Sequence, residues 1–342
     1  MTDFVNLHTH THDSAFDGLG TEARFVERAQ ELGQTAIGFT EHGSLRGLYT
    51  AHNVCEKAGV KLVPGAALYL ADNAALGSLA ADEKKSLAKH NPGREERRAA
   101  TKRVEQQRRE RAHITVWAMN DVGLINLYKL TTWAWQRGFY YKPRIDLKRL
   151  EEHNEGLIVT TGCPGGAVLA PILERDFKTA ISRAEHLARV FGPRFYVELM
   201  PHRPLDRPDP TSTLLRIATE FEAGVIATQD AHYPIAEDAP AQDVLLCIHT
   251  NNYMHDPERF RFDTHEYFLR TRDDMRAAFG AWLPGLPGSV RERALASTLA
   301  LAEACTARIK TGRGLHLVAP PLPRGISSYD DWVSRLSAIG SL

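Results

Sequence analysis

The sequence predicts a closed α/β barrel, and two observations lead to that fold class. Short apolar or β-branched segments alternate with helical patterns seven times along the 342 residues, which is typical of a largely parallel sheet. The strand segments are apolar almost throughout, which indicates burial on both faces. No GxGxxG motif follows the first segment, so a dinucleotide-binding fold finds no support. A barrel of about seven βα units therefore fits better than an open, doubly wound sheet.

The predicted strands share a run of apolar or β-branched residues. They lie at residues 4–10, 36–42, 61–70, 113–120, 156–162, 194–200 and 224–230. Helical periodicity separates them, at residues 21–33, 45–59, 121–135, 176–191 and 211–224. Glycines 33, 59 and 224 stand at the ends of three of these helical segments, as glycine commonly does.

The composition is that of an ordinary globular protein, with 43% hydrophobic and 25% charged residues. The 42 Lys and Arg residues balance 42 Asp and Glu residues, so the net charge neither supports nor excludes a nucleic-acid partner. No apolar run approaches the roughly 18 residues of a membrane span, so no membrane partner is expected. The four cysteines are widely spaced, which argues against a disulfide framework and favours a cytoplasmic location.

Two segments depart from the alternation of strands and helices. Residues 72–112 form a charged insertion in which Lys and Arg outnumber Asp and Glu. Two interpretations stay open for it, a solvated helix or loop and a basic arm that contacts a phosphate backbone. From about residue 311, a linker rich in Pro and Gly leads to a short amphipathic helix near Ser327 or Ser328. We therefore expect a barrel domain at 1–310 and a linker with a helix at 311–342.

Polar side chains that can bind metal ions stand where predicted strands end. They are His8, His10, His42, Cys163, Asp230 and His232. Residues at i and i+2 of a strand point to the same face, so both members of an HxH or DxH pair can reach one ion. The carboxyl ends of parallel barrel strands meet at one mouth, and Asp17 lies in the loop after the first strand. Each residue alone is better explained by a structural role, but together they predict a Zn²⁺ or Mn²⁺ site.

Successive motifs of the chain resemble those of one family. HTHTHDSAFDG, FTEHGSLRG, VPGAALY, HITVWAMND, GFYYKPRIDLKRLEEHNEGLIVTTGCPGG, FYVEL, TQDAHY and DVLLCIHTNNYMHDPERFRF resemble motifs of the polymerase-and-histidinol-phosphatase (PHP) domain. The resemblance spans nearly the whole chain. GFYYKPRID and DVLLCIHT are similar to the branch at the N-terminus of the bacterial DNA polymerase III alpha subunit. The resemblance implies a distorted (βα)₇ TIM-like barrel.

The same resemblance implies up to three divalent metal ions, zinc or manganese, held by nine residues. Eight of these positions are matched here, by His8, His10, Asp17, His42, His113, Cys163, Asp230 and His232. Asp17, His42 and Asp230 are the implied catalytic residues. His113 opens its predicted strand instead of ending it, so we expect a bend or a shifted boundary there. At the ninth position the family has a metal-bridging Glu, where this chain has Ala67, and at least one ion is expected to bind more weakly.

The implied function is that of a metal-dependent phosphoesterase, most specifically a 3′→5′ exonuclease that proofreads during DNA replication. Lys142 and Arg144 are expected to contact the phosphate of a DNA 3′ end, or else to support the fold. The 342 residues contain no DxDxD cluster, so we do not expect this stand-alone chain to polymerise nucleotides. Ala67 favours an alternative, a catalytically weakened scaffold that binds a separate polymerase polypeptide or DNA. A small-molecule phosphatase is a third alternative.

Overall fold

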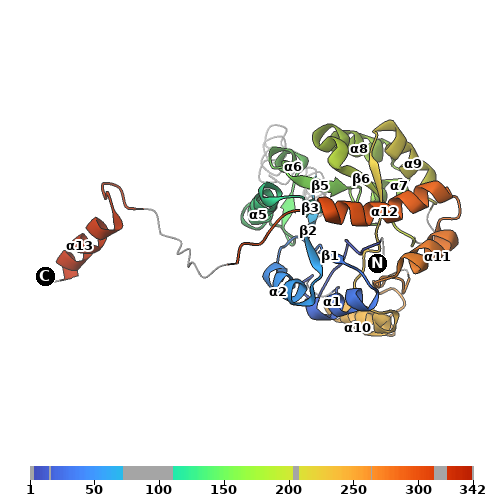
Figure 1. Ribbon diagram of the computed structural model, residues 1–342, viewed down its shortest axis with the longest axis horizontal. Coiled ribbons are helices and arrows are strands. Elements are labelled where there is room, and N and C mark those ends of the chain that lie inside the picture. Colours follow the sequence, from blue (N-terminus) through green and yellow to red (C-terminus); the bar gives the residue numbers. More distant parts are fainter. Residues whose placement is uncertain are drawn as a thin grey trace, which may run out of the picture. The chain divides into compact units, whose positions relative to one another are not determined.

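The computed structural model describes residues 4–14, 17–71, 111–202, 208–262, 264–311 and 322–340. The chain divides into two compact units, Met1–Arg308 and Ile309–Leu342, and the first unit contains the sheet (Figure 1). Apart from residues 111 and 112, the predicted charged insertion lies outside the described residues. Within the described ranges, no helix combines the length and the apolar character that crossing a membrane requires.

The first unit is built on one curled, mixed sheet, and its distorted TIM-like architecture confirms the predicted fold class. The strands are β1 (Ala36–Phe39), β2 (Lys61–Leu70), β3 (Ala112–Ala118), β4 (Arg144–Ile145), β5 (Leu157–Thr160), β6 (Phe195–Leu199) and β7 (Gly224–Ala227). Their order is β1-β2-β3-β5-β6-β7, and β4 pairs with β2 off this path. Six of the predicted strands are thus confirmed, and β4 is an addition.

The predicted first strand, at residues 4–10, is not a continuous strand, which corrects that expectation. It meets β1 through Asn6, and on its other side Thr9 forms a single bridge with Ala231 after β7. The amide of Gly38 in β1 donates to the carbonyl oxygen of Asn6 at 2.9 Å. Glycine is needed for this approach, because a Cβ at Gly38 would lie 2.3 Å from a carbonyl oxygen of the segment. The N-terminal segment therefore fills the gap between the two ends of the curled sheet.

Strand β3 runs antiparallel to both β2 and β5, which corrects the expectation of a parallel sheet. The pairs β1–β2, β5–β6 and β6–β7 are parallel, as predicted. An antiparallel pair needs no helical crossover between its strands. Because β3 runs opposite to β2 and β5, its first residues lie at the same end of the sheet as the carboxyl ends of the parallel strands.

Helices surround this sheet, and α12 crosses one end of the barrel (Figure 1). They are α1 (Glu22–Glu31), α2 (Leu48–Ala58), α5 (Asp121–Gln136), α6 (Leu147–Glu152), α7 (Leu169–Leu173), α8 (Phe177–Phe191), α9 (Thr211–Glu220), α10 (Ala239–His249), α11 (Arg272–Trp282) and α12 (Gly288–Ala304), with 3₁₀ turns η1 (Gly192–Arg194) and η2 (Ala236–Asp238). The five predicted helices correspond to α1, α2, α5, α8 and α9. In the second unit, α13 (Tyr329–Gly340) confirms the predicted C-terminal helix.

Local sequence explains where several helices begin and end. The side chains of Thr21, Asn120 and Asp176 cap α1, α5 and α8 by accepting backbone amides. Thr271 and Asp274 form a reciprocal capping box at α11. Helix α2 ends at Gly59 in the left-handed conformation, with φ of 66°.

The amino-terminal end of the parallel strands is filled with apolar side chains and closed by α12. The buried residues of this core are Val5, Leu7, Ala36, Val63, Trp117, Ile158, Ile226, Leu301, Ala302 and Cys305. The Thr298 hydroxyl of α12 accepts a hydrogen bond from the backbone amide of Val5 at 3.1 Å. The indole Nε1–H of Trp117 donates to the carbonyl oxygen of Leu7 at 3.0 Å. The apolar filling leaves the opposite end of the barrel for polar side chains.

Replacing Trp117 by Ala should lower the free energy of unfolding by about 3–5 kcal/mol. The substitution empties a fully buried position and removes the donor to Leu7. Urea unfolding followed by circular dichroism measures the loss. Val122→Ala, at a position of α5 that is 44% exposed, is the matched control and should change stability by less than about 0.5 kcal/mol. Equal losses in the two variants would contradict the role of the Trp117 core.

Candidate metal centre

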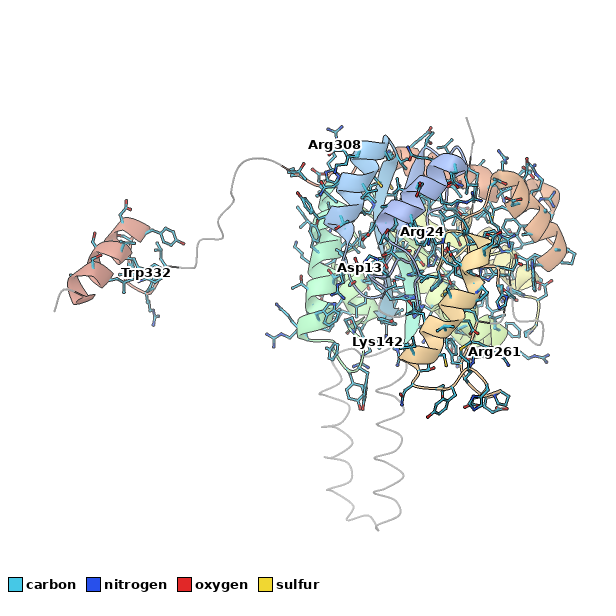
Figure 2. All side chains as sticks on the ribbon, turned by 90° about the horizontal axis from the view of Figure 1, so that it is seen from below. Asp13, Arg24, Lys142, Arg261, Arg308 and Trp332 are labelled. Carbon is cyan, nitrogen blue, oxygen red and sulfur yellow. The ribbon has the colours of Figure 1, made fainter. Side chains whose placement is uncertain are left out.

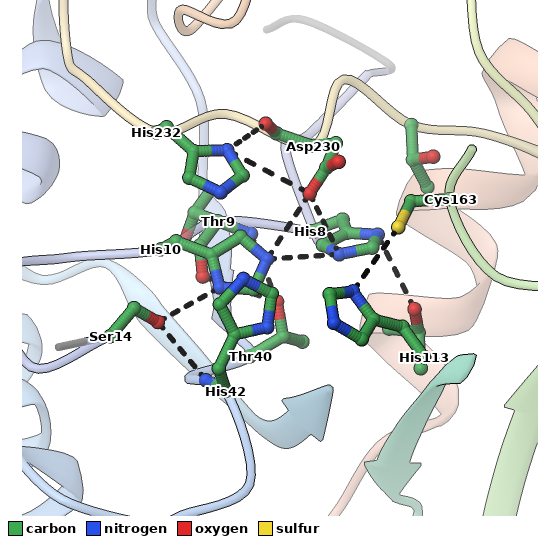
Figure 3. Close-up of polar contacts among 12 residues, drawn as sticks. His8, Thr9, His10, Ser14, Thr40, His42, His113, Cys163, Asp230 and His232 are labelled. Atoms are coloured by element: carbon green, nitrogen blue, oxygen red, sulfur yellow. Dashed lines mark hydrogen bonds and ion pairs between the residues drawn. The ribbon is translucent and has the colours of Figure 1, made fainter. Parts of the chain in front are cut away.

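The structure brings the predicted ligand residues together at the carboxyl end of the parallel strands (Figure 3). Figure 3 shows seven of them: His8, His10, His42, His113, Cys163, Asp230 and His232. Asp17 joins the group through an ion pair, since its Oδ2 lies 3.3 Å from Nε2 of His42. The pattern of polar residues at strand ends therefore identified side chains that share one site.

His113 reaches the centre because β3 is antiparallel, and this corrects the expected bend or shifted boundary. The second residue of β3 stands at the mouth, where the parallel strands end. Its Nδ1 lies 3.5 Å from Sγ of Cys163, which follows β5. The His113 amide donates to Gly165 at 2.9 Å and its carbonyl oxygen accepts from Ala167 at 2.7 Å. Two backbone bonds thus fix His113 against the loop that carries the thiol.

Two overlapping groups of side chains have the spacing of metal ligands. In the first, Nε2 of His8, Nε2 of His10 and Oδ1 of Asp230 lie 3.1 Å from one another. In the second, ligand atoms of His10, His42 and His232 all lie within 4.8 Å of one another. The ring of His10 stacks on that of His42 at 4.0 Å and on that of His232 at 4.5 Å. This packing brings the imidazole and carboxylate donors together in a small volume.

The surroundings lower the pKa values of four of the five imidazoles, those of His10, His42, His113 and His232. Burial also acts to lower the pKa of His8, but the carboxylates of Glu198 and Asp230 raise it above the usual value. Burial, together with the neighbouring imidazoles, lowers the pKa values of His10 and His42 well below the usual value. Burial also lowers the pKa of His113 to about 4. For Asp230, burial acts to raise the pKa, but the nearby His8 and His232 hold it well below its usual value. Neutral imidazoles beside an ionised carboxylate are the protonation states in which these groups bind metal.

A buried carboxylate fixes the orientation of His8. Nδ1 of His8 lies 2.6 Å from Oε1 of Glu198, in the middle of β6. Glu198 is fully buried and also accepts hydrogen bonds from the hydroxyls of Thr160, at 2.6 Å, and Thr228, at 2.7 Å. A carboxylate that accepts the Nδ1 proton leaves the lone pair of Nε2 directed at the centre.

A second carboxylate supports His10 through a hydroxyl. The Ser14 hydroxyl donates to Oε2 of Glu41 at 2.5 Å and lies 3.0 Å from Nδ1 of His10. Oγ of Ser14 also accepts a hydrogen bond from the backbone amide of His42 at 3.0 Å. Thr11 donates its amide and its hydroxyl to Glu41 as well. Ser14 and Glu41 therefore support the imidazole of His10 and the backbone of His42.

The residues present fit a divalent cation. Among the described residues, Oδ1 of Asp17 and Nδ1 of His42 are buried without a hydrogen-bond partner. A buried polar atom without a partner is costly, and a cation at the centre would relieve that cost. Imidazole, carboxylate and thiolate together are the donor set of zinc and of related transition metals.

Comparison with known proteins identifies the family. The PHP domain matches residues 6–202, which include His8, His10, Asp17, His42, His113 and Cys163. This chain belongs to the PHP family. Asp230 and His232 lie beyond the matched residues, in the part of the chain that longer alignments cover.

Relatives of this PHP domain are DNA polymerase III alpha subunits. The subunit of Borreliella burgdorferi is 30% identical over 98% of this chain, and that of Saccharopolyspora erythraea is 33% identical over 82%. The chain spans 26% and 23% of the lengths of these two relatives. A solved two-domain protein of Bacteroides vulgatus, described as containing a predicted PHP-like metal-dependent phosphoesterase, shares 16% identity with a TM-score of 0.38, over 69% of this chain and 54% of its own.

Ala67 faces the centre of this PHP domain. It lies two residues before Tyr69 on β2, so both point to the same face, and the Tyr69 ring lies 6.0 Å from that of His42. Ala67 pairs with Thr115 of β3, whose Oγ1 is 3.4 Å from Nδ1 of His8. A glutamate at this position would extend between the two strands toward the imidazoles, and the methyl group of Ala67 supplies no ligand there.

The two expected phosphate contacts occupy different surroundings. Lys142 is half-buried, and its Nζ lies 5.6 Å from the centroid of the Tyr69 ring. Burial lowers the pKa of Lys142, although the nearby Asp17 acts to raise it. Arg144 is 2% exposed in β4, and its Nε–H donates to the carbonyl oxygen of Gly138 at 3.1 Å. Lys142 therefore borders the metal centre, whereas Arg144 bonds to the loop that precedes it.

The supporting residues are the part of the site that sequence patterns did not single out. Glu198 had one available signal, because it is a charged residue inside an otherwise apolar predicted strand. Glu41 and Ser14 carry no such signal, since polar residues near a strand end are common. Their roles depend on distances between segments that only the fold brings together.

Replacing Glu198 by Gln should weaken metal binding about 10- to 100-fold, because the neutral amide orients and polarises His8 less well. Titration against a chelator of known affinity measures the change. Glu292→Gln, which removes an acidic side chain of α12 paired with Arg276, is the control and should bind metal like the unmodified chain. Equal affinity in the two variants would show that Glu198 does not support the centre.

Proposed function

We propose that this PHP domain binds divalent metal ions, zinc or manganese, at the described centre and hydrolyses phosphodiesters. The observation that carries the proposal is the convergence of imidazoles, two aspartates and a thiol at one end of the barrel.

The residues divide the proposed reaction between them. His8, His10, His42, His113, Cys163, Asp230 and His232, with Asp17, would hold the ions. Bound divalent ions polarise a phosphodiester and lower the pKa of water. In the hydrolysis, a water oxygen bonds to phosphorus, the bond to the leaving oxygen breaks, and that oxygen departs with a proton.

Three residues are proposed as catalytic, Asp17, His42 and Asp230. Asp17 is the accessible carboxylate of the centre, with 25% of its side chain exposed against 7% for Asp230. It faces Nε2 of His42, so a proton can pass between the reacting water and this pair. Oδ1 of Asp230 contacts Nε2 of both His8 and His10, and it therefore fixes these two imidazoles relative to each other within the centre. Lys142, beside Asp17, is proposed to contact the substrate phosphate.

The proposed substrate is the 3′ end of DNA, from which a 3′→5′ exonuclease would release nucleotides during proofreading. The relatives named DNA polymerase III subunit alpha support a place in DNA replication. A separate polymerase polypeptide is a further proposed partner, because those relatives are named as subunits of DNA polymerase III.

One observation favours a second function, a scaffold with weakened catalysis. The position where the family has a metal-bridging glutamate holds Ala67, and its side chain faces the centre. A centre with one carboxylate fewer neutralises less of the positive charge of two neighbouring cations. Such a domain would retain its fold and bind a polymerase or DNA without efficient hydrolysis.

Elemental analysis should find at least one equivalent of zinc or manganese per chain after purification without chelator. Asp230→Asn should lose most of it, because the variant removes the charge shared by His8 and His10. The unmodified chain should also hydrolyse bis(4-nitrophenyl) phosphate, a small diester, and stop when metal is removed. Near-zero metal in both proteins, with both folded by circular dichroism, would refute the proposed enzyme.

Replacing Ala67 by Glu should raise both the metal content and the rate of diester hydrolysis, because it returns a carboxylate to the centre between β2 and β3. Ala67→Gln is the matched control, since it has nearly the same size without the charge. A gain in the Glu variant alone supports a weakened enzyme. No gain, with the fold intact, would mean that the centre is complete without this carboxylate.

A further inference from the structure

Exposed aromatic side chains gather beside the metal centre, on a surface that the proposed chemistry does not use. Trp135 and Phe139 are each 53% exposed, and Tyr141 is 66% exposed. They lie at the end of α5 and in the loop that follows it, and we call these three residues the aromatic rim. Large aromatic side chains at this exposure are candidates for binding a planar partner.

The direction of β3 places the aromatic rim at the mouth. Because β3 runs away from the mouth, α5 after it returns toward the mouth and ends there. The indole Nε1–H of Trp135 donates to the carbonyl oxygen of Gly43 at 3.0 Å, and Gly43 follows His42 directly. Gly43 adopts a left-handed conformation, in which a Cβ would lie 2.7 Å from Pro143 and 2.9 Å from the ring of Tyr69. The rim is therefore anchored to the loop that carries a proposed metal ligand.

The rings of the rim are arranged as a stacking surface. Trp135 and Phe139 stack with centroids 5.4 Å apart and an interplanar angle of 23°. Tyr141 has a left-handed backbone, with φ of 58°, which is uncommon for a residue with a bulky side chain. Its ring packs edge-on against Tyr140 at 4.8 Å. This loop thus presents an aromatic side chain to solvent in a backbone conformation that tertiary contacts must hold.

A cationic side chain lies between the rim and the centre. Lys142 follows Tyr141, and its ammonium group lies over the Tyr69 ring. Figure 2 places Lys142 and Arg261 at the same end of the first unit. A single nucleic-acid strand with its bases on the rim would bring its phosphates past the positive charge of Lys142 on the way to the centre. That combination of stacking rings and cations is typical of single-strand binding surfaces.

We propose that the aromatic rim binds unpaired bases of a single-stranded nucleic acid, whose backbone runs past Lys142 to the metal centre. The proposal rests on the proposed function for the reaction, and it adds the substrate form and the residues that bind it. Stacking is insensitive to base identity, so the rim would accept any sequence and would discriminate against paired bases, whose faces are already covered.

The test measures binding of a short, fluorescent oligothymidylate with phosphorothioate linkages that resist hydrolysis, using the full chain. Trp135→Ala with Phe139→Ala should weaken binding about tenfold or more. Phe139→Ala alone should weaken it in the same direction while leaving the bond from Trp135 to Gly43 intact. Trp135→Phe should retain most of the affinity, since it keeps an aromatic face.

Tyr128→Ala is the matched control. Tyr128 is a 41% exposed aromatic residue of the same helix, about 10 Å nearer the start of α5, and its variant should bind like the unmodified chain. Double-stranded DNA should bind more weakly than the single strand to the unmodified chain. Unchanged affinity in the double variant would overturn the proposal, and this is also the outcome expected if the rim binds another protein. An equal loss in Tyr128→Ala would overturn it too.

Hydrolysis of bis(4-nitrophenyl) phosphate separates this proposal from the proposed function. The small diester has no bases to span the rim, so the Phe139→Ala variant should hydrolyse it like the unmodified chain. Rim-dependent binding without any hydrolysis would uphold the inference on binding and refute the enzyme. Metal-dependent hydrolysis with rim-independent binding would uphold the enzyme and refute the inference.

Discussion

The ion-paired carboxylate of Asp230 is the interaction around which the mouth of the barrel is organised. Its Oδ1 lies 3.1 Å from Nε2 of both His8 and His10, at a position where 5% of the residue is exposed. A buried carboxylate without partners would be neutral or destabilising, so its charge requires those imidazoles nearby. The imidazoles in turn present lone pairs to one another at close range. This packing is favourable when a positive charge, a proton or a metal ion, lies among them.

The backbone around this carboxylate is held in a conformation that favours the contact. Asp230 has φ of 51°, and a left-handed residue other than glycine costs about 1–3 kcal/mol unless its surroundings compensate. The next residue, Ala231, is paired on both sides, since its amide donates to His8 and its carbonyl oxygen accepts from His10. The same two histidines therefore contact the Asp230 side chain and fix the backbone that presents it. Side-chain and backbone contacts reinforce each other across the join between the N-terminal segment and the end of β7.

The sequence predicts the members of this centre better than it predicts how they are held. The sequence placed His8 with His10, and Asp230 with His232, at one site, and the structure brings all four side chains together although Asp230 has a left-handed backbone. The direction of β3 was not predictable in the same way, because a buried strand has the same apolar pattern in either orientation. Residues 4–10 have a strand-like pattern, yet single bridges replace a continuous ladder there. Glu198 can be recognised as a supporting residue only in the folded structure, where β5 and β7 lie on either side of β6 and hydroxyls from both sides donate to its carboxylate.

The reversal of β3 has two consequences on the same face of the β2–β3 pair. It brings His113 to the mouth, and it sets Thr115 beside Ala67, where the family's glutamate would otherwise extend. Among the described members of the centre, despite burial, the neighbouring imidazoles hold the pKa of Asp230 well below its usual value, whereas burial raises the pKa values of Asp17 and of the Cys163 thiol well above theirs. These last two groups supply negative charge only when a cation displaces their protons. Glu41 and Glu198 are engaged one layer behind, through Ser14 and His8. Because buried cations repel one another strongly unless anions lie between them, the number of ions that this centre can hold depends on these few anionic groups.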